Sequence, residues 1–180
     1  MLTHSPGSQL WDAAFIAQAL YESRLAAAPQ NRDSLVKVLQ WLEDCQLRRD
    51  PKHMKGIARH PTKGAWPFST NEQGFTVADC TAEGMKAVMM LQSVEGMPEL
   101  VSRERLRDAI DIILSLQNAD GGFATCEPTR GSKYLELINP AEVFRDIMID
   151  YSYPECTTAC LTAMRLFQRY DSDYRTADLE

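Results

Sequence analysis

The chain has 180 residues, enough to bury a single hydrophobic core, and a formal net charge of -6. This charge balance excludes an electrostatic nucleic-acid footprint, which requires clustered Lys and Arg. No stretch approaches the ~18 uninterrupted apolar residues of a membrane-spanning helix, and the N-terminus lacks a signal-peptide pattern, so we expect an intracellular protein without a spanning helix.

Apolar spacing and helix-start signals predict five helices, and no run has the alternation of a β-strand. In chain order they are Gln9–Leu25, Asp33–Leu47, Asp79–Ser93, Arg103–Asn118 and Pro154–Tyr170. Asp33 or Ser34 is expected to cap the second helix, and Pro154 suits the first turn of the fifth because its missing N–H needs no partner there. The Gly-, Pro- and Asn-rich stretches Asp50–Gly74 and Asp120–Pro140 are predicted to be ordered loops.

The five helices are of two kinds. The second and fourth carry many charges and one apolar stripe each, which indicates half-solvated outer helices. The other three are rich in Ala, Thr, Cys and Met and are expected to be inner helices packed on several sides. Each inner helix opens with an acidic residue, at Asp12, Asp79 and Glu155, followed by small residues. This degenerate hairpin repeat predicts an all-α fold, an incomplete α/α barrel, whose edges something else should cover.

The cysteines and histidines bear on metal and disulfide chemistry. Five cysteines, none in a C-x-x-C pair, argue against a disulfide framework and a zinc knuckle, and favour a reducing compartment. The three histidines, His4, His53 and His60, lie in loop-like contexts. We therefore expect no metal site.

The strongest candidate for chemistry is the stretch Asp79-Cys80-Thr81-Ala82-Glu83. In a helix, its two carboxylates four residues apart share a face. Two close carboxylates with restricted solvent resist ionising together, so one can stay protonated near neutral pH. A neutral Asp79 would be a Brønsted acid. From spacing alone, a helix-capping role for Asp79 is equally open.

Several strings along the chain resemble the oxidosqualene cyclase family. They are Gly7–Asp12, Asp79–Glu83, Gln117–Thr125, Asn139–Phe144 and Asp146–Tyr151, in collinear order. The resemblance implies that residues 1–180 form a partial catalytic α/α-barrel domain of a longer cyclase. It also implies that the Gln117–Phe123 segment, and the more degenerate Lys63–Trp66, brace the outer helices through loop contacts.

The resemblance implies a reaction and roles for four residues. Asp79 would protonate the epoxide of (S)-2,3-oxidosqualene and start a cationic cyclisation to lanosterol or a related triterpene, with no cofactor. Cys80 and Cys156 match thiols that hydrogen-bond to this acid, and Glu83 matches a proton relay. Relatives that protonate squalene itself carry a second Asp at the position of Cys80, so this chain points to the epoxide.

The resemblance also implies residues that line the substrate cavity. Trp11 and Phe68 match aromatic side chains whose faces stabilise cations, although core packing is the ordinary role of both residue types. Cys126 stands where the family usually has a cavity-lining Tyr, and Phe75 where a Trp is common. The loss of the aromatic face at Cys126 bears on product identity. Cys160, four residues after Cys156, is expected to be a small core residue.

The partners implied are the lipid substrate, the endoplasmic-reticulum membrane or lipid-droplet surface, and the remaining parts of the cyclase chain. Those parts supply the family's general base, a His that none of the three histidines here matches. We expect the isolated chain to be inactive, because an incomplete pocket admits water that quenches cations. The alternative function is a non-catalytic helical-repeat remnant or interaction module. A prenyltransferase-type α/α barrel is a structural runner-up, without evident zinc ligands.

Overall fold

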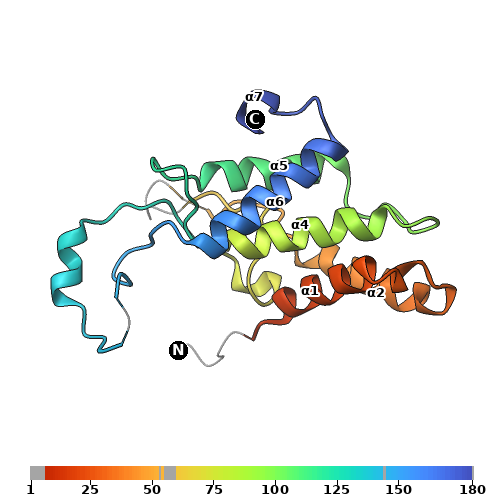
Figure 1. The fold of residues 1–180 in the computed structure, drawn as a ribbon, viewed down its shortest axis with the longest axis horizontal. Coiled ribbons are helices and arrows are strands. Elements are labelled where there is room, and N and C mark those ends of the chain that lie inside the picture. Colours follow the sequence, from red (N-terminus) through yellow and green to blue (C-terminus); the bar gives the residue numbers. More distant parts are fainter. Residues whose placement is uncertain (1–6, 53, 55–59, 144, 180) are drawn as a thin grey trace.

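A computed structural model describes residues 7–52, 54, 60–143 and 145–179 of the chain, which are built from helices (Figure 1). In chain order the α-helices are α1 (Gln9–Glu22), α2 (Arg32–Cys45), α4 (Ala78–Gln92), α5 (Arg103–Ser115), α6 (Pro154–Tyr170) and α7 (Thr176–Leu179). Short 3-10 helices span Leu25–Ala27, Pro29–Asn31, Asn71–Gln73 and Lys133–Ile138. Extended pairing within these residues is limited to an isolated bridge between Gln117 and Phe123. None of the described helices is long and apolar enough to cross a bilayer.

Helix α4 lies at the centre of the fold. It packs against α1 on one side and α6 on the other, while α2 and α5 pack outside this inner layer. Leu35, Leu39 and Leu42 form the buried stripe of α2, and Leu106, Ile110 and Ile113 form that of α5. The predicted all-α arrangement of inner and outer helices is therefore confirmed.

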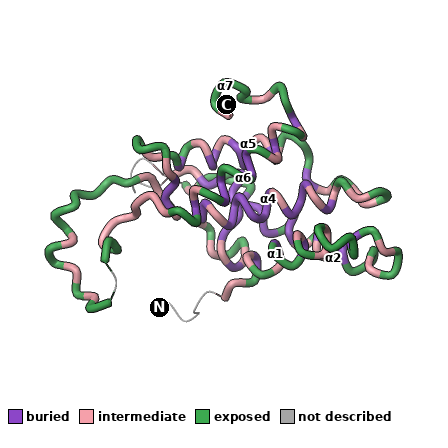
Figure 2. The backbone as a smooth tube through the Cα atoms, in the orientation of Figure 1, coloured by how far each residue is buried: buried purple, intermediate pink, exposed green. Residues whose placement is uncertain are grey.

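The inner helices differ in how completely they are buried (Figure 2). Most residues of α4 are buried, as expected for an inner helix packed on several sides. The same expectation is wrong for α1 and α6, which each bury one face and expose large apolar side chains on another. Ile16 on α1 and Leu161 on α6 are 59% and 52% exposed. Both helices lie at the edges of the inner layer, where the described part of the chain offers no further helix.

Helix boundaries depart from the prediction where local backbone conformation intervenes. Helix α1 ends at Glu22 rather than Leu25, because Arg24 adopts a left-handed conformation with φ of 63°. The expected cap of α2 by Asp33 or Ser34 is wrong: the 3-10 turn Pro29–Asn31 runs directly into the helix, which begins at Arg32. Pro154 occupies the first turn of α6, as predicted.

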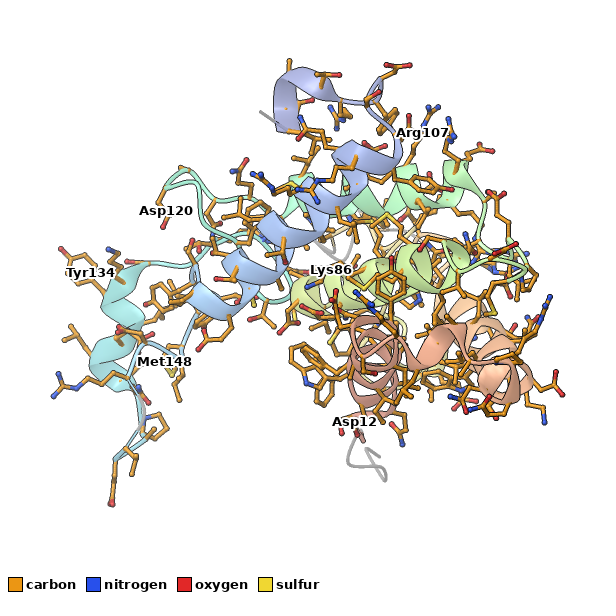
Figure 3. The ribbon with its side chains drawn as sticks, turned by 45° about the vertical axis from the view of Figure 1, so that its right-hand side comes forward. Asp12, Lys86, Arg107, Asp120, Tyr134 and Met148 are labelled. Atoms are coloured by element: carbon orange, nitrogen blue, oxygen red, sulfur yellow. The ribbon has the colours of Figure 1, made fainter. Side chains whose placement is uncertain are left out.

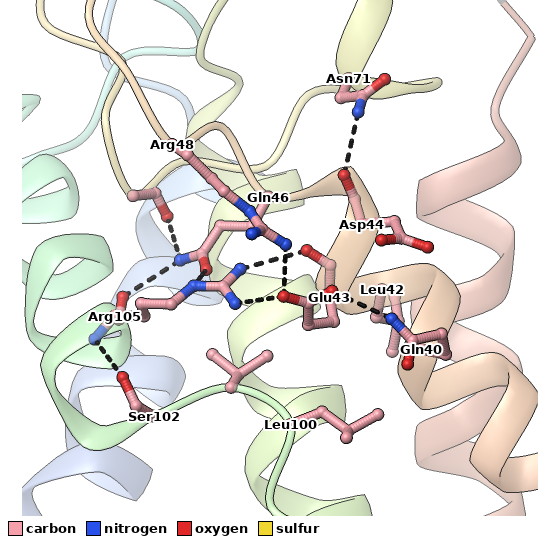
Figure 4. A network of polar contacts seen from close by, with 12 residues as sticks. Gln40, Leu42, Glu43, Asp44, Gln46, Arg48, Asn71, Leu100, Ser102 and Arg105 are labelled. Carbon is pink, nitrogen blue, oxygen red and sulfur yellow. Dashed lines mark hydrogen bonds and ion pairs between the residues drawn. The ribbon is translucent and has the colours of Figure 1, made fainter.

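Trp66 connects outer helix α2 to α4, and Gln46 connects the end of α2 to outer helix α5. The Trp66 ring is fully buried, its Nε1–H donates to the Leu42 carbonyl at 2.8 Å, and it packs so closely on Gly84 of α4 that a Cβ there would lie 2.9 Å from its Cγ. The Gln46 side-chain amide donates to the carbonyls of Gly64 and Arg105, and its oxygen accepts from Arg105 Nε at 2.8 Å (Figure 4). Arg105 also pairs with Glu43, so the end of α2 is fastened to α5.

The structure describes one of the two predicted loops only in part, and it places a 3-10 helix in the other. Part of Asp50–Gly74, including residues 53 and 55–59, lies outside the described residues, as do His4 and His53. The stretch Asp120–Pro140 is not loop throughout, since it contains the 3-10 helix Lys133–Ile138 on an arm that extends away from the core (Figure 1). Leu137 and Val143 on this arm are more than four-fifths exposed.

Candidate active site

The first turn of α4 is held between two loops. The Ala78 N–H donates to the Thr125 carbonyl at 2.6 Å. The Thr81 hydroxyl donates to the Val77 carbonyl at 2.8 Å and accepts from the Trp66 N–H at 3.0 Å. These bonds fix the position of the one residue that lies between them and carries an acidic side chain, Asp79.

Asp79 is half-buried, and its carboxylate accepts hydrogen bonds from the Cys80 N–H at 2.7 Å and from the Cys80 thiol. Burial raises the pKa of Asp79 above its ordinary value, Cys80's two donors oppose the rise, and the Glu83 charge adds a smaller upward push. This is the direction that an acid needs, with burial as the main cause. The N-cap position itself belongs to Val77, so Asp79 is not the capping residue but serves a free N–H within the first turn.

Three thiols lie around this carboxyl group, those of Cys80, Cys156 and Cys160. Burial raises the pKa of Cys80 above the physiological range, which keeps its thiol protonated as a donor. Burial also raises the pKa of Cys156 to about 11; its Sγ lies 3.7 Å from Thr125 Oγ1, and the Asp79 charge acts on it through space. Cys160 is fully buried, as expected of a core residue, and its Sγ contacts the Ala78 carbonyl at 3.9 Å.

Glu83 lies one turn beyond Asp79 and is only 5% exposed. Its Oε2 accepts from the Gln18 amide of α1 at 2.7 Å, and its Oε1 lies 2.8 Å from Lys86 Nζ. Lys86 Nζ also donates to Thr162 Oγ1 of α6 at 3.1 Å, where the three inner helices meet (Figure 3). Sequence reasoning missed Gln18 and Lys86, although the three-residue spacing from Glu83 to Lys86 is a recognisable ion-pair signal.

Trp11 and Phe68 are brought together at the start of α1. Their ring centroids are 6.1 Å apart, and the Leu10 N–H donates to the Ser69 carbonyl at 3.2 Å, which ties the helix to the Phe68 loop. Both rings are partly buried against the core. The two aromatic side chains therefore lie side by side, and their role toward cations stays a prediction.

Comparison with known proteins decides the family. The family model of the squalene-hopene cyclase C-terminal domain matches residues 7–178. The chain belongs to this cyclase family. Similar curated relatives include a lanosterol synthase of Pneumocystis carinii, 52% identical over 99% of the chain, and protostadienol synthase A of Neosartorya fischeri, 45% identical over 97%. A cycloartenol synthase of Dictyostelium discoideum is 48% identical over 91% of the chain.

The alignments cover 25%, 24% and 23% of these three relatives, so the chain spans about a quarter of the length of the curated cyclases it matches. The resemblance to oxidosqualene cyclases that the sequence strings carried is therefore confirmed at the level of the family. The relatives bear different product names at comparable identity, so identity over this segment does not separate the products.

Two residues expected to differ from the family pattern, Cys126 and Phe75, line the same cavity. Cys126 and Phe75 both line a cavity of about 240 Å³, together with His60 and Glu127. The imidazole of His60 lies 2.8 Å from Ser115 Oγ, and burial followed by the charge of Arg130 lowers the pKa of His60, which leaves it neutral. No group of three or more His, Cys, Asp or Glu within the described ranges is placed to hold a metal ion.

Asp150 holds the loop that carries Cys126. Its carboxylate accepts from the backbone N–H groups of Thr125, Cys126 and Glu127 at 3.0, 2.6 and 3.1 Å. The same segment provides the Thr125 carbonyl that accepts from Ala78. Asp150 therefore helps to position the first turn of α4 through Thr125. Its long-range role had no sequence signal beyond its place in a family string.

Proposed function

We propose that this chain carries the acid site of an oxidosqualene cyclase, in which Asp79 protonates the epoxide of (S)-2,3-oxidosqualene. The observation that carries the proposal is a half-buried Asp79 carboxyl group with the N–H and thiol of Cys80 beside it, a burial that raises the pKa of Asp79. Its position in the Asp79–Glu83 string supports the same role.

The first chemical step follows from this arrangement. The Asp79 proton passes to the epoxide oxygen, the C–O bond to the more substituted carbon breaks, and the oxygen becomes a hydroxyl group. The electron-poor carbon is then attacked by the neighbouring alkene, which starts cyclisation. Asp79 is left as a carboxylate, and the Cys80 N–H and thiol stabilise that product of proton loss.

Other residues would support the reaction. Glu83 relays a proton back to Asp79, and Cys156 places a second thiol near the acid. Trp11 and Phe68 present aromatic faces to cations, a contribution on the order of 1–2 kcal/mol each when desolvated. Cys126 lines the cavity and influences which triterpene forms, with lanosterol, protostadienol and cycloartenol as the products that relatives' names indicate.

We further propose that residues 1–180 are one part of the catalytic barrel, completed by other parts of the cyclase. The exposed large apolar side chains of α1, α6 and the arm support this, because other parts of the cyclase would remove them from water. Membrane association, at the endoplasmic reticulum or at lipid droplets, would then reside in those other parts. The 180-residue chain alone should form no cyclised product from oxidosqualene, and detection of such a product would contradict this.

Turnover in a full-length cyclase that contains this segment tests the acid. Asp79→Asn should lower formation of cyclised product by about 100-fold or more, the scale of general acid catalysis. Asp33→Asn, which changes an exposed carboxylate on outer helix α2, is the matched control and should leave turnover unchanged. Product formation by Asp79→Asn at the unmodified rate would refute the proposed function.

A further inference from the structure

Two acidic side chains and one basic side chain lie in a row along the inner helix α4. Asp79, Glu83 and Lys86 are spaced by four and three residues, which places them on one helix face. The side chains of Glu83 and Lys86 are 6% and 13% exposed, and they form an ion pair at 2.8 Å. Gln18 from α1 and Thr162 from α6 hold the two ends of this pair, so it is fixed by both neighbouring helices.

The two carboxyl groups of the row have different partners. Glu83 has an ammonium group beside it and an amide donor. The donors to Asp79 are its own backbone N–H and the N–H and thiol of Cys80, all of which are uncharged. A carboxylate removed from water is tolerated when a cation compensates its charge, and otherwise takes up a proton. The row therefore favours a charge on Glu83 and a proton on Asp79.

We propose that Lys86 is a positioning residue that assigns the single proton of the carboxyl pair to Asp79. The inference rests on the proposed function, since it takes Asp79 as the acid, and it adds the group that decides which of two neighbouring carboxyls plays that part. Lys86 does this without touching the substrate.

The remaining groups around the pair do not supply this asymmetry. The thiols of Cys80, Cys156 and Cys160 are neutral because burial raises the pKa of each. Cys160 experiences the charges of Asp79, Glu83 and Lys86 together, which places all three in one electrostatic environment. Asp150 and Glu155 act on Cys156, but both are negative and favour neither carboxyl with a cation.

Removal of the cation should move the proton. In Lys86→Met, a carboxylate at Glu83 would keep only the Gln18 amide, so Glu83 becomes the carboxyl group of the pair that keeps its proton to the higher pH. In Lys86→Arg, the charge and the reach to Glu83 are retained, and the proton stays on Asp79. Lys86→Gln keeps a donor but no charge, and should behave as Lys86→Met.

Isotope-edited infrared spectroscopy of the 180-residue chain reports the proton directly. With the Asp carboxyl carbons labelled with ¹³C, the C=O band that persists to the highest pH should shift with the label in the unmodified chain and in Lys86→Arg. In Lys86→Met and Lys86→Gln it should no longer shift, and Glu83→Gln added to either should make the remaining high-pH band shift with the Asp label again. Lys63→Met, which removes the exposed ammonium partner of Asp108, is the matched control and should resemble the unmodified chain.

A band that still shifts with the Asp label in both Lys86→Met and Lys86→Gln, with helicity retained by circular dichroism, would overturn the assignment. The readout needs no turnover, so it fails or succeeds independently of the proposed function. If Asp79→Asn leaves a full-length cyclase active, the function fails even when the band moves as described.

Discussion

The Cys80 N–H donates to the Asp79 carboxylate across 2.7 Å, within the first turn of α4, whose residues are mostly buried. This bond and the Cys80 thiol lower the pKa of Asp79, yet burial outweighs them and the net direction is upward. A carboxyl group with a raised folded-state pKa binds a proton more tightly in the folded than in the unfolded chain. The raised pKa of Asp79 therefore makes the stability of the fold depend on pH.

The raised pKa of Asp79 predicts how the effect of Asp79→Asn on stability changes with pH. Below the ordinary value of 3.8, Asp79 is protonated in both states and carries no cost. As pH rises from 3.8 to the raised folded-state pKa, the unmodified chain loses stability, because the carboxyl group ionises in the unfolded chain while the folded chain still holds its proton. The melting temperature of Asp79→Asn should therefore gain on that of the unmodified chain as pH rises from 3 to 7.

Asp171 provides a control of opposite sign. Its hydrogen-bonded ion pair with Arg107, at 2.7 Å, lowers the pKa of Asp171. The stabilisation is present above 3.8 and is lost as pH falls through the lower folded-state value, so Asp171→Asn should be destabilising at pH 7 and approach neutrality in acid. Parallel pH profiles for the two variants would contradict both assignments.

The contact between Trp66 and Gly84 predicts that Gly84→Ala, which adds one methyl group, lowers the free energy of unfolding. An Ala at an ordinary helix position is more favourable than Gly by about 1 kcal/mol. At residue 84 its Cβ would lie 2.9 Å from Trp66 Cγ, against a ring held on its other side by Leu42. Gly84→Ala should cost about 1–3 kcal/mol in urea denaturation, as an overpacked core does. A variant as stable as the unmodified chain, or more so, would show that the Trp66 brace is loose.

The polar network at the end of α2 should be worth more than an exposed ion pair. Arg105→Met removes donors to the Gln46 oxygen and to the Glu43 carboxylate, whose side chain is 12% exposed. We expect a loss of about 2 kcal/mol in the free energy of unfolding. Lys63→Met, which breaks the exposed pair with Asp108, should have a much smaller effect. Equal losses in the two variants would contradict a role for the network as a brace.

Thiol reactivity should single out Cys126. Cys45, Cys80, Cys156 and Cys160 are buried, whereas Cys126 is half-exposed and lines the cavity beside Phe75. A maleimide reagent should therefore modify one thiol of the folded chain well before the others, and peptide mass spectrometry should place it at residue 126. Cys126→Ser should abolish the fast phase. A fast phase that persists in this variant would mean that another cysteine opens to solvent.

Much of this architecture is encoded locally and was predictable. The Leu35 and Ile110 stripes repeat with helical period, and Pro154 begins α6 because its ring suits a first turn. The end of α1 was not predictable, because the left-handed Arg24 that terminates it is neither Gly nor Asn.

The candidate site divides in the same way. The carboxyl pair of Asp79 and Glu83 follows from spacing within one helix. Gln18, Thr125 and Asp150 come from other elements, and the contacts they make span 23 to 65 residues of sequence. Such contacts depend on how helices and loops pack, which a residue pattern along one helix does not contain.

The pKa of Asp79 itself tests the account most directly. A ¹³C NMR titration of the aspartate side chains, assigned by the signal missing in Asp79→Asn, would follow this carboxyl group in the folded chain. The account predicts a midpoint above the ordinary value of 3.8, with a further upward displacement in Cys80→Ala, which removes the thiol that donates to the carboxylate. A midpoint at or below 3.8 in the unmodified chain would contradict it, because an acid that is already ionised has no proton to give.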